Sequence, residues 1–327
     1  MNPFFVIIGK IPPPIGGVRV HVDRLIDLLK TNNLNFRFVN LSDKISFRSL
    51  KQILRAKFIH LHTSNVWLRL FFSILCFIIR QRLIITYHGE IGRFSGFLNF
   101  LENISIRLAY LPIALNMKSC IIAQSLNNKS RLISVFIPPG SCEAQDKLPI
   151  DYVEKLRSAN CKFVFCTTAC AVSYDRFGRE IYGIISLIDL FNHHPDLGLI
   201  VSDPTGAYNS LLVETSANVG KNIVILSFPH SFVDVIRMSD CMIRATTTDG
   251  DSISVREALL FNRPVVASDC VERPKGCILF PAGDFVKLGQ ILEEFSPPKR
   301  LEIDSNEFNG AGELVCLYKK ILEYKKD

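Results

Sequence analysis

The stretch of sequence that decides the fold runs Asp249-Gly-Asp-Ser-Ile-Ser-Val-Arg-Glu257 and continues directly into Ala258-Leu-Leu-Phe-Asn-Arg-Pro-Val-Val-Ala-Ser-Asp269. An acidic, glycine-containing turn opens a short helix, the helix ends near Asn262, and a valine-rich strand follows Pro264. A loop that enters a helix in this way presents backbone N–H groups at the positive end of the helix dipole. Such a position suits a phosphate group, and Glu257, further along the helix, is able to accept hydrogen bonds from sugar hydroxyls.

The same residues also allow a purely local interpretation. Ser254-Val-Arg-Glu257 fits a capping box, in which the serine caps the helix and the glutamate reaches back to the N–H group of the cap residue. Glu257 would then do no more than stabilise the start of its helix. Capping boxes are frequent, so this motif by itself leaves both interpretations open.

A second glycine-containing turn lies near the start of the chain. The buried strand Phe4–Gly9 is followed by Lys10-Ile-Pro-Pro-Pro-Ile-Gly16-Gly17-Val18 and then by an amphipathic helix from about His21 to Lys30. The paired glycines allow a ligand to approach the backbone without meeting a Cβ atom. Their spacing matches neither a Walker loop nor a dinucleotide fingerprint. A plain turn between strand and helix is the alternative.

A histidine follows a third predicted strand, in Leu83-Ile-Ile-Thr-Tyr-His88-Gly89-Glu90. Ligands gather at the carboxyl ends of strands in open α/β sheets, so His88 is placed for function. His60 and His62 alternate within another strand, Phe58–His62. No metal-ligand set forms around them by spacing, and we interpret both as structural.

These three motifs resemble the GT4-type retaining glycosyltransferases, enzymes of the GT-B fold that include those of bacterial surface polysaccharides. In that family an acidic residue, seven intervening residues and a glutamate lie in the second domain, and Asp249 stands here where a glutamate is usual. The Pro-Pro-x-Gly-Gly-Val segment resembles the family's opening loop, which lies against the donor phosphate and the acceptor. His88 matches a histidine that faces the sugar.

The resemblance implies a role for each matching residue. Asp249 would face the donor sugar, Glu257 would hold the nucleotide ribose, and the amides of residues 250–252 would hold the diphosphate. The site expected from the sequence consists of His88, Arg176 and Asp249 as catalytic residues, and of Gly16, Gly17, Arg244, Gly250, Asp251, Ser252 and Glu257 as donor-binding residues.

One segment departs from the family pattern. After the strand Phe163–Thr167 the family has a Gly-Arg turn and then a lysine, whereas this chain has Thr168-Ala-Cys-Ala-Val-Ser-Tyr-Asp-Arg176-Phe-Gly-Arg179. Arg176 or Arg179 would substitute for the basic residue at the diphosphate, with an exposed arginine at a helix start as the alternative. Arg244 supplies another cation. Because arginines and helix ends hold a diphosphate, we expect neither a metal nor another cofactor.

Strands and helices alternate along the chain, which predicts parallel sheets covered by helices on both faces. A segment rich in proline and polar residues interrupts the alternation, so we expect two doubly wound, Rossmann-like domains that face a central cleft. The predicted organisation is an N-terminal acceptor-side domain over 1–140, a linker over 141–160 and a C-terminal nucleotide-sugar-binding domain over 161–327. In GT-B proteins the last helix, here about 312–325, often crosses back to the first domain. Among the strands we expect one over Cys120–Ala123.

Composition fits a protein of this class. The 327 residues are enough for two domains, and 48% of them are hydrophobic. Ten cysteines without a Cys-x-x-Cys pair indicate reduced thiols in the cytoplasm. We interpret Phe4–Ile8 as a first strand rather than as a signal peptide.

Charge is distributed unevenly along the chain. Residues 1–150 contain 19 Lys or Arg and 7 Asp or Glu, whereas residues 151–327 contain 19 and 24. The basic half implies an anionic partner, and no nucleic-acid-binding motif accompanies it, so we expect no nucleic acid. Because apolar segments accompany the charge, we expect a peripheral contact with the inner face of the plasma membrane or a lipid-diphosphate acceptor. The uncharged segment Leu70–Ile79 lies between Arg69 and Arg80 and is shorter than the roughly 20 residues that span a bilayer. Because it is apolar nearly all round, a core helix is favoured over an interfacial one.

The sequence therefore predicts a cytoplasmic, hexosyltransferase-like enzyme that moves a sugar from a nucleoside-diphosphate donor to a hydroxyl of a lipid-linked or polysaccharide-precursor acceptor. The donor sugar, the base, the acceptor, the linkage and the oligomeric state stay open. A nucleotide-sugar epimerase on the same fold is one alternative. A non-catalytic partner that binds nucleotide sugar or membrane and assists another transferase is the second.

Overall fold

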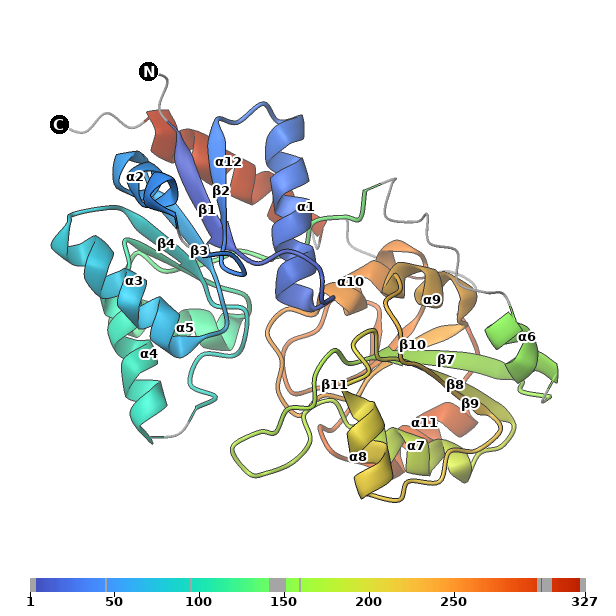
Figure 1. Cartoon of the computed structure of the whole chain (residues 1–327). Helices are drawn as coiled ribbons and strands as arrows, with labels where there is room; N and C mark the ends of the chain where they lie inside the picture. Colours follow the sequence, from blue (N-terminus) through green and yellow to red (C-terminus); the bar gives the residue numbers. More distant parts are fainter. Residues whose placement is uncertain are drawn as a thin grey trace. The chain divides into compact units, whose positions relative to one another are not determined.

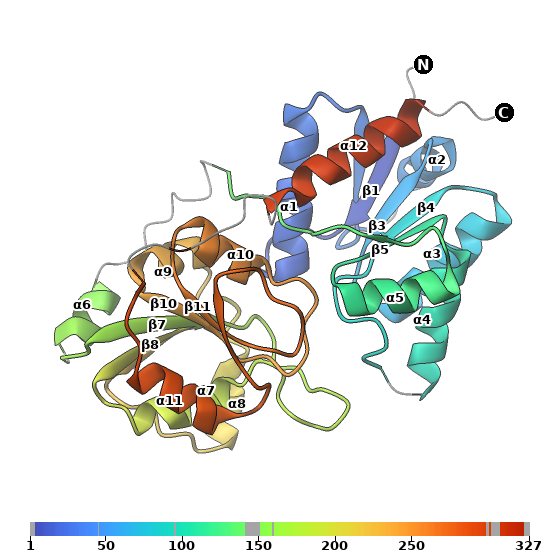
Figure 2. The same ribbon diagram turned by 180° about the vertical axis from the view of Figure 1, so that it is seen from behind.

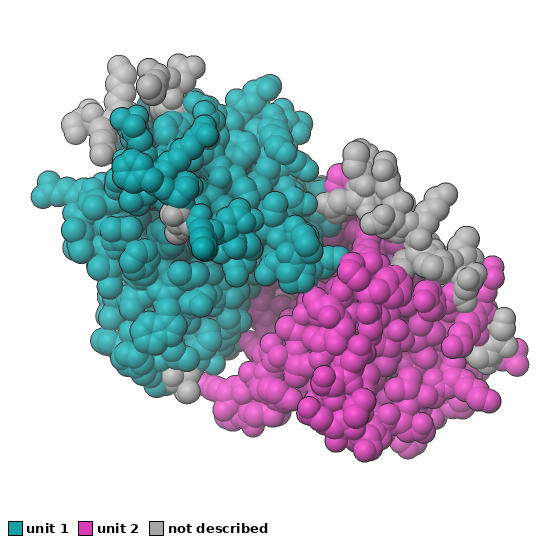
Figure 3. Space-filling view, in the orientation of Figure 1, with its two compact units in different colours: residues 1–138, 308–327 teal, residues 139–307 magenta. Residues whose placement is uncertain are grey.

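The structure, a computed structural model, describes residues 4–44, 46–94, 96–140, 151–158, 160–298, 301 and 308–323. The chain divides into two compact units. Unit 1 contains residues 1–138 and 308–327, and unit 2 contains residues 139–307 (Figure 3). Each unit is built on one parallel sheet of six strands (Figure 1).

The sheet of unit 1 has the strand order β2-β1-β3-β4-β5-β6, and every neighbouring pair is parallel. Its strands are β1 (Phe5–Gly9), β2 (Phe36–Asn40), β3 (Ile59–His62), β4 (Leu83–Thr86), β5 (Leu111–Ala114) and β6 (Arg131–Leu132). Its helices are α1 (Gly17–Thr31), α2 (Phe47–Arg55), α3 (Val66–Ile78), α4 (Gly96–Leu108), α5 (Met117–Leu126) and α12 (Gly310–Glu323). All residues of β1, β3 and β4 are buried, because helices cover both faces of a parallel sheet.

Helix α12 belongs to unit 1 although it follows unit 2 in the sequence, and both views show it beside β1 (Figures 1 and 2). The ring of Tyr318 packs on Phe5 and Phe58, with centroid distances of 5.0 and 5.6 Å. Its hydroxyl lies 2.6 Å from Nδ1 of His60. At the start of the helix, a Cβ atom on Gly310 would collide with the carbonyl oxygen of Ser134. The helix is therefore fitted closely into the core of unit 1.

Unit 2 repeats the doubly wound plan with the strand order β12-β11-β10-β7-β8-β9. Its strands are β7 (Phe163–Thr168), β8 (Leu197–Ser202), β9 (Ile223–Leu226), β10 (Cys241–Arg244), β11 (Val265–Ser268) and β12 (Cys277–Phe280). Its helices are α6 (Asp151–Ser158), α7 (Ile184–Asn192), α8 (Tyr208–Glu214), α9 (Phe232–Met238), α10 (Ile253–Leu260) and α11 (Phe285–Glu293). Residues 141–150 of the predicted linker lie outside the described residues, and its second part forms α6.

Two local predictions are wrong. The expected strand over Cys120–Ala123 is part of helix α5, whose first turn is capped by the side chain of Asn116, which accepts a hydrogen bond from the N–H of Ser119 at 2.8 Å. The apolar segment in α3 is not a core helix, because only one of its faces packs inward. Trp67, Phe71 and Ile78 on its other face are 56%, 57% and 71% exposed.

Among the described residues, no helix has both the length and the apolar character needed to cross a bilayer.

Candidate functional site

Three charged residues of unit 2, Arg244, Asp249 and Arg273, lie together at the carboxyl ends of the adjacent strands β7, β10 and β11. Arg244, the last residue of β10, donates to Asp249 through Nε (3.0 Å to Oδ2) and Nη2 (3.2 Å to Oδ1). Arg273, which follows β11, donates to Oδ2 of Asp249 through Nη1 at 2.9 Å. This edge of a parallel α/β sheet is where ligands bind in doubly wound folds.

The cluster of Arg244, Asp249 and Arg273 carries two positive charges and one negative charge. Burial alone would raise the pKa of the Asp249 carboxyl, but the two guanidinium groups outweigh it and hold that pKa well below its usual range. Asp249 is therefore ionised, and one positive charge remains. Side-chain exposure is 11% for Arg244 and 2% for Arg273, so Arg244 is the more accessible of the two cations.

The N-terminus of α10 adjoins this cluster in the sequence. Its N-cap residue, Ser252, makes no capping hydrogen bond with its side chain to any described residue. In three other helices of unit 2, a carboxylate that precedes the helix accepts a hydrogen bond from a backbone N–H group of the first turn. Glu180 accepts from Ile184 in α7, Asp203 from Tyr208 in α8, and Asp284 from Lys287 in α11. The N-cap side chain at the start of α10 does not close its helix in this way, and a helix N-terminus suits an anion.

The capping-box interpretation of Glu257 is wrong. Helix α10 begins at Ile253, so Ser254 lies inside the helix and not at the cap position. The hydroxyl of Ser254 lies 3.0 Å from that of Ser252. Glu257 is only 4% exposed, which is costly for a carboxylate unless polar groups surround it.

Two of the expected donor-binding residues are already engaged within the loop. The N–H of Gly250 donates to Oδ1 of Asp249 at 3.0 Å. Asp251 pairs with Arg256, whose Nε lies 2.6 Å from Oδ1. We therefore leave the Gly250 amide out of the candidate anion site. The N–H groups that follow it, at the first turn of α10, remain part of that site.

Arg176 and Arg179 lie in a loop of unit 2 between β7 and α7. A bridge between Tyr174 and Glu180 closes the loop. Arg179 pairs with Asp175, with 2.8 Å between Nε and Oδ2. Arg176 is exposed and lies over the ring of Phe177 at 4.7 Å. Of the two arginines, Arg176 is thus the one that the loop does not hold in an ion pair within the described part of the chain.

In unit 1, Gly16 and Gly17 stand at the start of α1. Gly16 is the N-cap residue and has no side chain to cap the helix. A Cβ atom added at either glycine would meet no described atom within 4 Å. Packing inside the chain therefore does not demand glycine at these positions. A role of the two glycines in ligand binding stays a prediction.

His88 follows β4 and is half-buried, and it does not stand alone. Its Nε2 lies 3.1 Å from Nδ1 of His62, and its ring centroid lies 5.2 Å from that of His21. Burial lowers the pKa of His21 to about 4 and lowers the pKa values of His60, His62 and His88 well below the ordinary value. The four rings are therefore neutral at neutral pH. Sequence spacing gave no indication that three of them meet.

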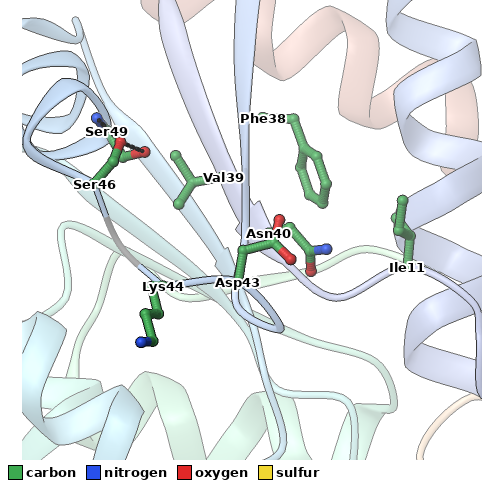
Figure 4. Close-up of a pocket in the computed structure, with 8 residues that line it drawn as sticks. All are labelled: Ile11, Phe38, Val39, Asn40, Asp43, Lys44, Ser46 and Ser49. Carbon is green, nitrogen blue, oxygen red and sulfur yellow. Dashed lines mark hydrogen bonds between the residues drawn. The ribbon is translucent and has the colours of Figure 1, made fainter.

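A small cavity of about 460 Å³ opens in unit 1 at the carboxyl end of β2 (Figure 4). It is lined by Ile11, Phe38, Val39, Asn40, Asp43, Lys44, Ser46 and Ser49. The side chains of Asn40 and Asp43 point toward one another, and the hydroxyls of Ser46 and Ser49 are 3.0 Å apart. The lining offers hydrogen-bond donors and acceptors together, as a polar ligand requires.

Arg273 was missed by the sequence reasoning. It lies in Cys270-Val-Glu-Arg273-Pro, a loop with no motif around it. Its Nη2 donates to the hydroxyl of Thr246 at 3.1 Å and its Nε to the carbonyl of Ser268 at 3.0 Å, so the loop fixes it in place. Only the position of the loop after a predicted strand gave a signal, because strand ends carry ligand-binding residues.

The two doubly wound units form the GT-B fold. HepE from Anabaena in complex with UDP-glucose is similar with a TM-score of 0.69 and 16% identity, over 98% of both chains. Sucrose-phosphate synthase from Thermosynechococcus elongatus is similar with a TM-score of 0.66 and 14% identity, over 98% of this chain and 99% of that one. The pneumococcal O-GlcNAc transferase GtfA, in complex with UDP and GlcNAc, follows with a TM-score of 0.51 and 13% identity, over 81% of this chain and 56% of that one.

No protein-family model and no curated protein sequence matches the chain. At sequence identities of 13–16%, the structural similarity establishes the fold alone.

Proposed function

We propose that the protein is a GT4-type retaining glycosyltransferase. It would move a sugar from a nucleoside-diphosphate donor to a hydroxyl of a lipid-linked or polysaccharide-precursor acceptor. The observation that carries the proposal is the cationic cluster of Arg244, Asp249 and Arg273 beside the start of α10, at the strand ends of a GT-B unit. Likeness to HepE with bound UDP-glucose and to GtfA with bound UDP supports a nucleotide-sugar donor.

In this proposal unit 2 binds the donor. Arg244 and the backbone N–H groups of Asp251 and Ser252, which directly precede the first residue of α10, hold the diphosphate, and Arg176 adds a second cation from its exposed loop. Glu257 holds the ribose. Groups fixed in advance stabilise the charge that develops on the departing diphosphate, which is the largest electrostatic task of the reaction. No cofactor and no divalent metal takes part in donor binding.

The geometry changes the role that we assign to Asp249. Both of its carboxylate oxygens accept hydrogen bonds from arginines. Rather than facing the sugar as the resemblance implied, Asp249 holds Arg244 in the orientation that the diphosphate needs. In unit 1, Gly16 and Gly17 let a substrate approach the backbone, and the half-buried His88 presents its ring at the end of β4.

A donor screen tests the proposal. We expect one of UDP-glucose, GDP-mannose or dTDP-glucose to raise the melting temperature by about 5–10 °C at 100 times its dissociation constant, since such saturation contributes about 2.7 kcal/mol. The rise should persist in EDTA. A rise that vanishes in EDTA and returns with Mg²⁺ or Mn²⁺ would show that donor binding needs a metal.

Product analysis then separates the alternatives. A transferase releases the nucleoside diphosphate from the bound donor, slowly to water and faster to an acceptor. An epimerase converts the sugar of the donor without any acceptor. A partner protein without activity binds the donor and leaves it intact, and that result would contradict the proposed transfer.

We further propose that unit 1 contacts an anionic membrane surface on the cytoplasmic side. With α12 included, unit 1 holds 22 Lys or Arg against 8 Asp or Glu, and unit 2 holds 16 against 23. Helices α3 and α4 pack together and expose an apolar, mostly aromatic face made of Trp67, Phe71, Ile74, Ile78, Phe97 and Phe100. The Trp67 and Phe97 rings are 6.1 Å apart, so the face is continuous between the helices. Arg69 takes no part, because it is buried against Glu102 at 2.8 Å.

Co-sedimentation of the full chain with vesicles measures this contact. We expect binding to vesicles that contain phosphatidylserine, weaker binding at high salt, and none to neutral vesicles. The double variant Trp67→Ser/Phe97→Ser should bind at least about tenfold more weakly, since each buried aromatic contributes roughly 1.5–3 kcal/mol. Val286→Ser, at a position 76% exposed in unit 2, is the matched control and should bind like the parent. If both variants lose vesicle binding equally, or if the parent does not bind anionic vesicles at low salt, the positive charge of unit 1 serves another partner.

A further inference from the structure

Three histidines from three separate elements of unit 1 converge at the carboxyl end of its sheet. His21 comes from α1, His62 is the last residue of β3, and His88 follows β4. One ring nitrogen from each lies within 4.8 Å of the others. The ring centroids of His21 and His62 are 5.0 Å apart, and those of His62 and His88 are 5.4 Å apart.

The hydrogen bond of His21 fixes which of its nitrogens carries hydrogen. Its Nδ1 lies 2.7 Å from the carbonyl oxygen of Val135, and a carbonyl only accepts, so Nδ1 must donate. In a neutral ring the lone pair then lies on Nε2. Metal-binding histidines have this arrangement, with the second nitrogen held by a backbone carbonyl or a carboxylate.

Two buried nitrogens at this place lack a partner in the part of the chain that the structure describes. They are Nε2 of His21 and Nε2 of His62, and both side chains are 1% exposed. An unsatisfied buried polar atom is costly, so each such atom in a folded protein calls for an explanation. A ligand that accepts the lone pair of His21 supplies one.

The neighbouring His60 shows what a purely structural histidine looks like in the same core. Its Nδ1 lies 2.6 Å from the hydroxyl of Tyr318 and its Nε2 lies 2.8 Å from that of Thr86. Both nitrogens are thus satisfied by the protein. His60 packs on His62 with 4.0 Å between ring centroids, which supports the ring of His62 and leaves His60 out of the ligand set.

We propose that His21, His62 and His88 bind one transition-metal ion of the zinc type. Neutral imidazole nitrogens suit zinc, cobalt, nickel and copper, whereas magnesium and calcium require oxygen ligands. Zinc–nitrogen bonds of about 2.0–2.1 Å place neighbouring ligand nitrogens about 3.3 Å apart. Nδ1 of His62 and Nε2 of His88, which share a hydrogen bond at 3.1 Å, already have this spacing. A metal ion would take the place of the shared hydrogen, and small rotations of the rings bring the His21 nitrogen closer.

Three protein ligands leave a fourth position of a tetrahedral site open. His88 is the half-buried member of the trio, so this position lies toward its accessible side. All three ligands belong to unit 1, so the metal site does not depend on donor binding by unit 2. It also differs from a metal on the diphosphate, which the proposed function does not use.

Cobalt provides a direct test on the full chain without a histidine tag. The protein is treated with EDTA, exchanged into metal-free buffer and titrated with Co²⁺. We expect one equivalent to produce the visible absorption of tetrahedral cobalt, and Zn²⁺ to displace it. Because the chain has cysteines, a strong sulfur-to-cobalt charge-transfer band would indicate thiolate ligands instead and overturn the assignment.

Variants locate the site. His88→Gln and His62→Gln should each lower the affinity for Co²⁺ by at least tenfold, and the melting temperature of each should no longer rise with Zn²⁺. His193→Ala, at an exposed histidine of unit 2, is the matched control and should bind like the parent. If His62→Gln does not fold, the half-buried His88 position still gives an answer. Stoichiometric binding that survives in His88→Gln, or no binding by the parent at millimolar Co²⁺, would overturn the proposal. UDP-glucose binding is measured separately and enters neither result.

Discussion

Replacing Asp249 with asparagine is expected to destabilise unit 2 by roughly 3–5 kcal/mol, the usual effect of removing one partner from a buried ion pair. The asparagine keeps the shape but leaves Arg244 and Arg273 buried without a counter-charge, with side chains 11% and 2% exposed. The affinity for the donor should fall as well, because Arg244 loses the carboxylate that orients it. Urea unfolding and calorimetric donor titration measure the two effects.

The matched control for this variant is Asp196→Asn. Asp196 pairs with Lys162 at 3.1 Å, but the two side chains are 49% and 71% exposed. A pair of this kind contributes about 0–1 kcal/mol, so the control should unfold almost like the parent. Similar losses in both variants would show that the cluster is no stronger than a surface pair.

The lowered pKa of Asp249 predicts how acid changes the stability of the fold. Because the folded-state pKa of Asp249 lies below its unfolded value of about 3.9, its stabilisation is fully present above that pH. It is lost progressively as the pH falls further, when the proton binds first to the unfolded chain. The Asp249→Asn variant lacks this contribution, so the stability difference between parent and variant should shrink below about pH 4.

Replacing Glu257 with alanine is expected to abolish sugar transfer by weakening donor binding. Loss of one charge-assisted hydrogen bond to the ribose costs roughly 1.5–3 kcal/mol, which corresponds to about a 10- to 150-fold rise in the dissociation constant. Glu257→Gln keeps the volume at this buried position and should show most of the same loss. Isothermal titration with the donor found in the screen measures it.

Glu293→Gln, on an exposed side chain at the end of α11, controls for a general effect of removing a carboxylate. Its donor affinity should match the parent. The informative contrary result is a Glu257 variant with the parent's affinity and a lower melting temperature. It would mean that the buried carboxylate only supports α10.

The sequence predicted the fold class because strand and helix patterns are local. Strands such as Leu83–Thr86 are buried on both faces, so they need several consecutive apolar residues, and such a run is visible in the sequence. Cys120–Ala123 misled the prediction because its apolar residues fit a strand equally well, and the Asn116 cap that decides for a helix lies four residues earlier. The exposed face of α3 was missed because hydropathy alone does not show which apolar side chains find a partner.

The candidate site divides in the same way. The segment from Asp249 to Glu257 was recognisable because one loop and one helix carry it. Arg273 and the trio of His21, His62 and His88 come from elements distant in sequence, so no spacing along the chain indicates them. Only the topology of the sheets, which brings strand ends together, makes such groups neighbours.

The position of α12 also has a consequence for how the protein is made. Unit 2 is an insertion between the two parts of unit 1, and Tyr318 meets its hydrogen-bond partner His60 across 258 residues. During synthesis on a ribosome, unit 2 is complete while the core of unit 1 still lacks its last helix. A chain that stops before α12 therefore contains the whole of unit 2 and an unfinished unit 1. Premature termination near the C-terminus damages the part of the fold that begins the sequence.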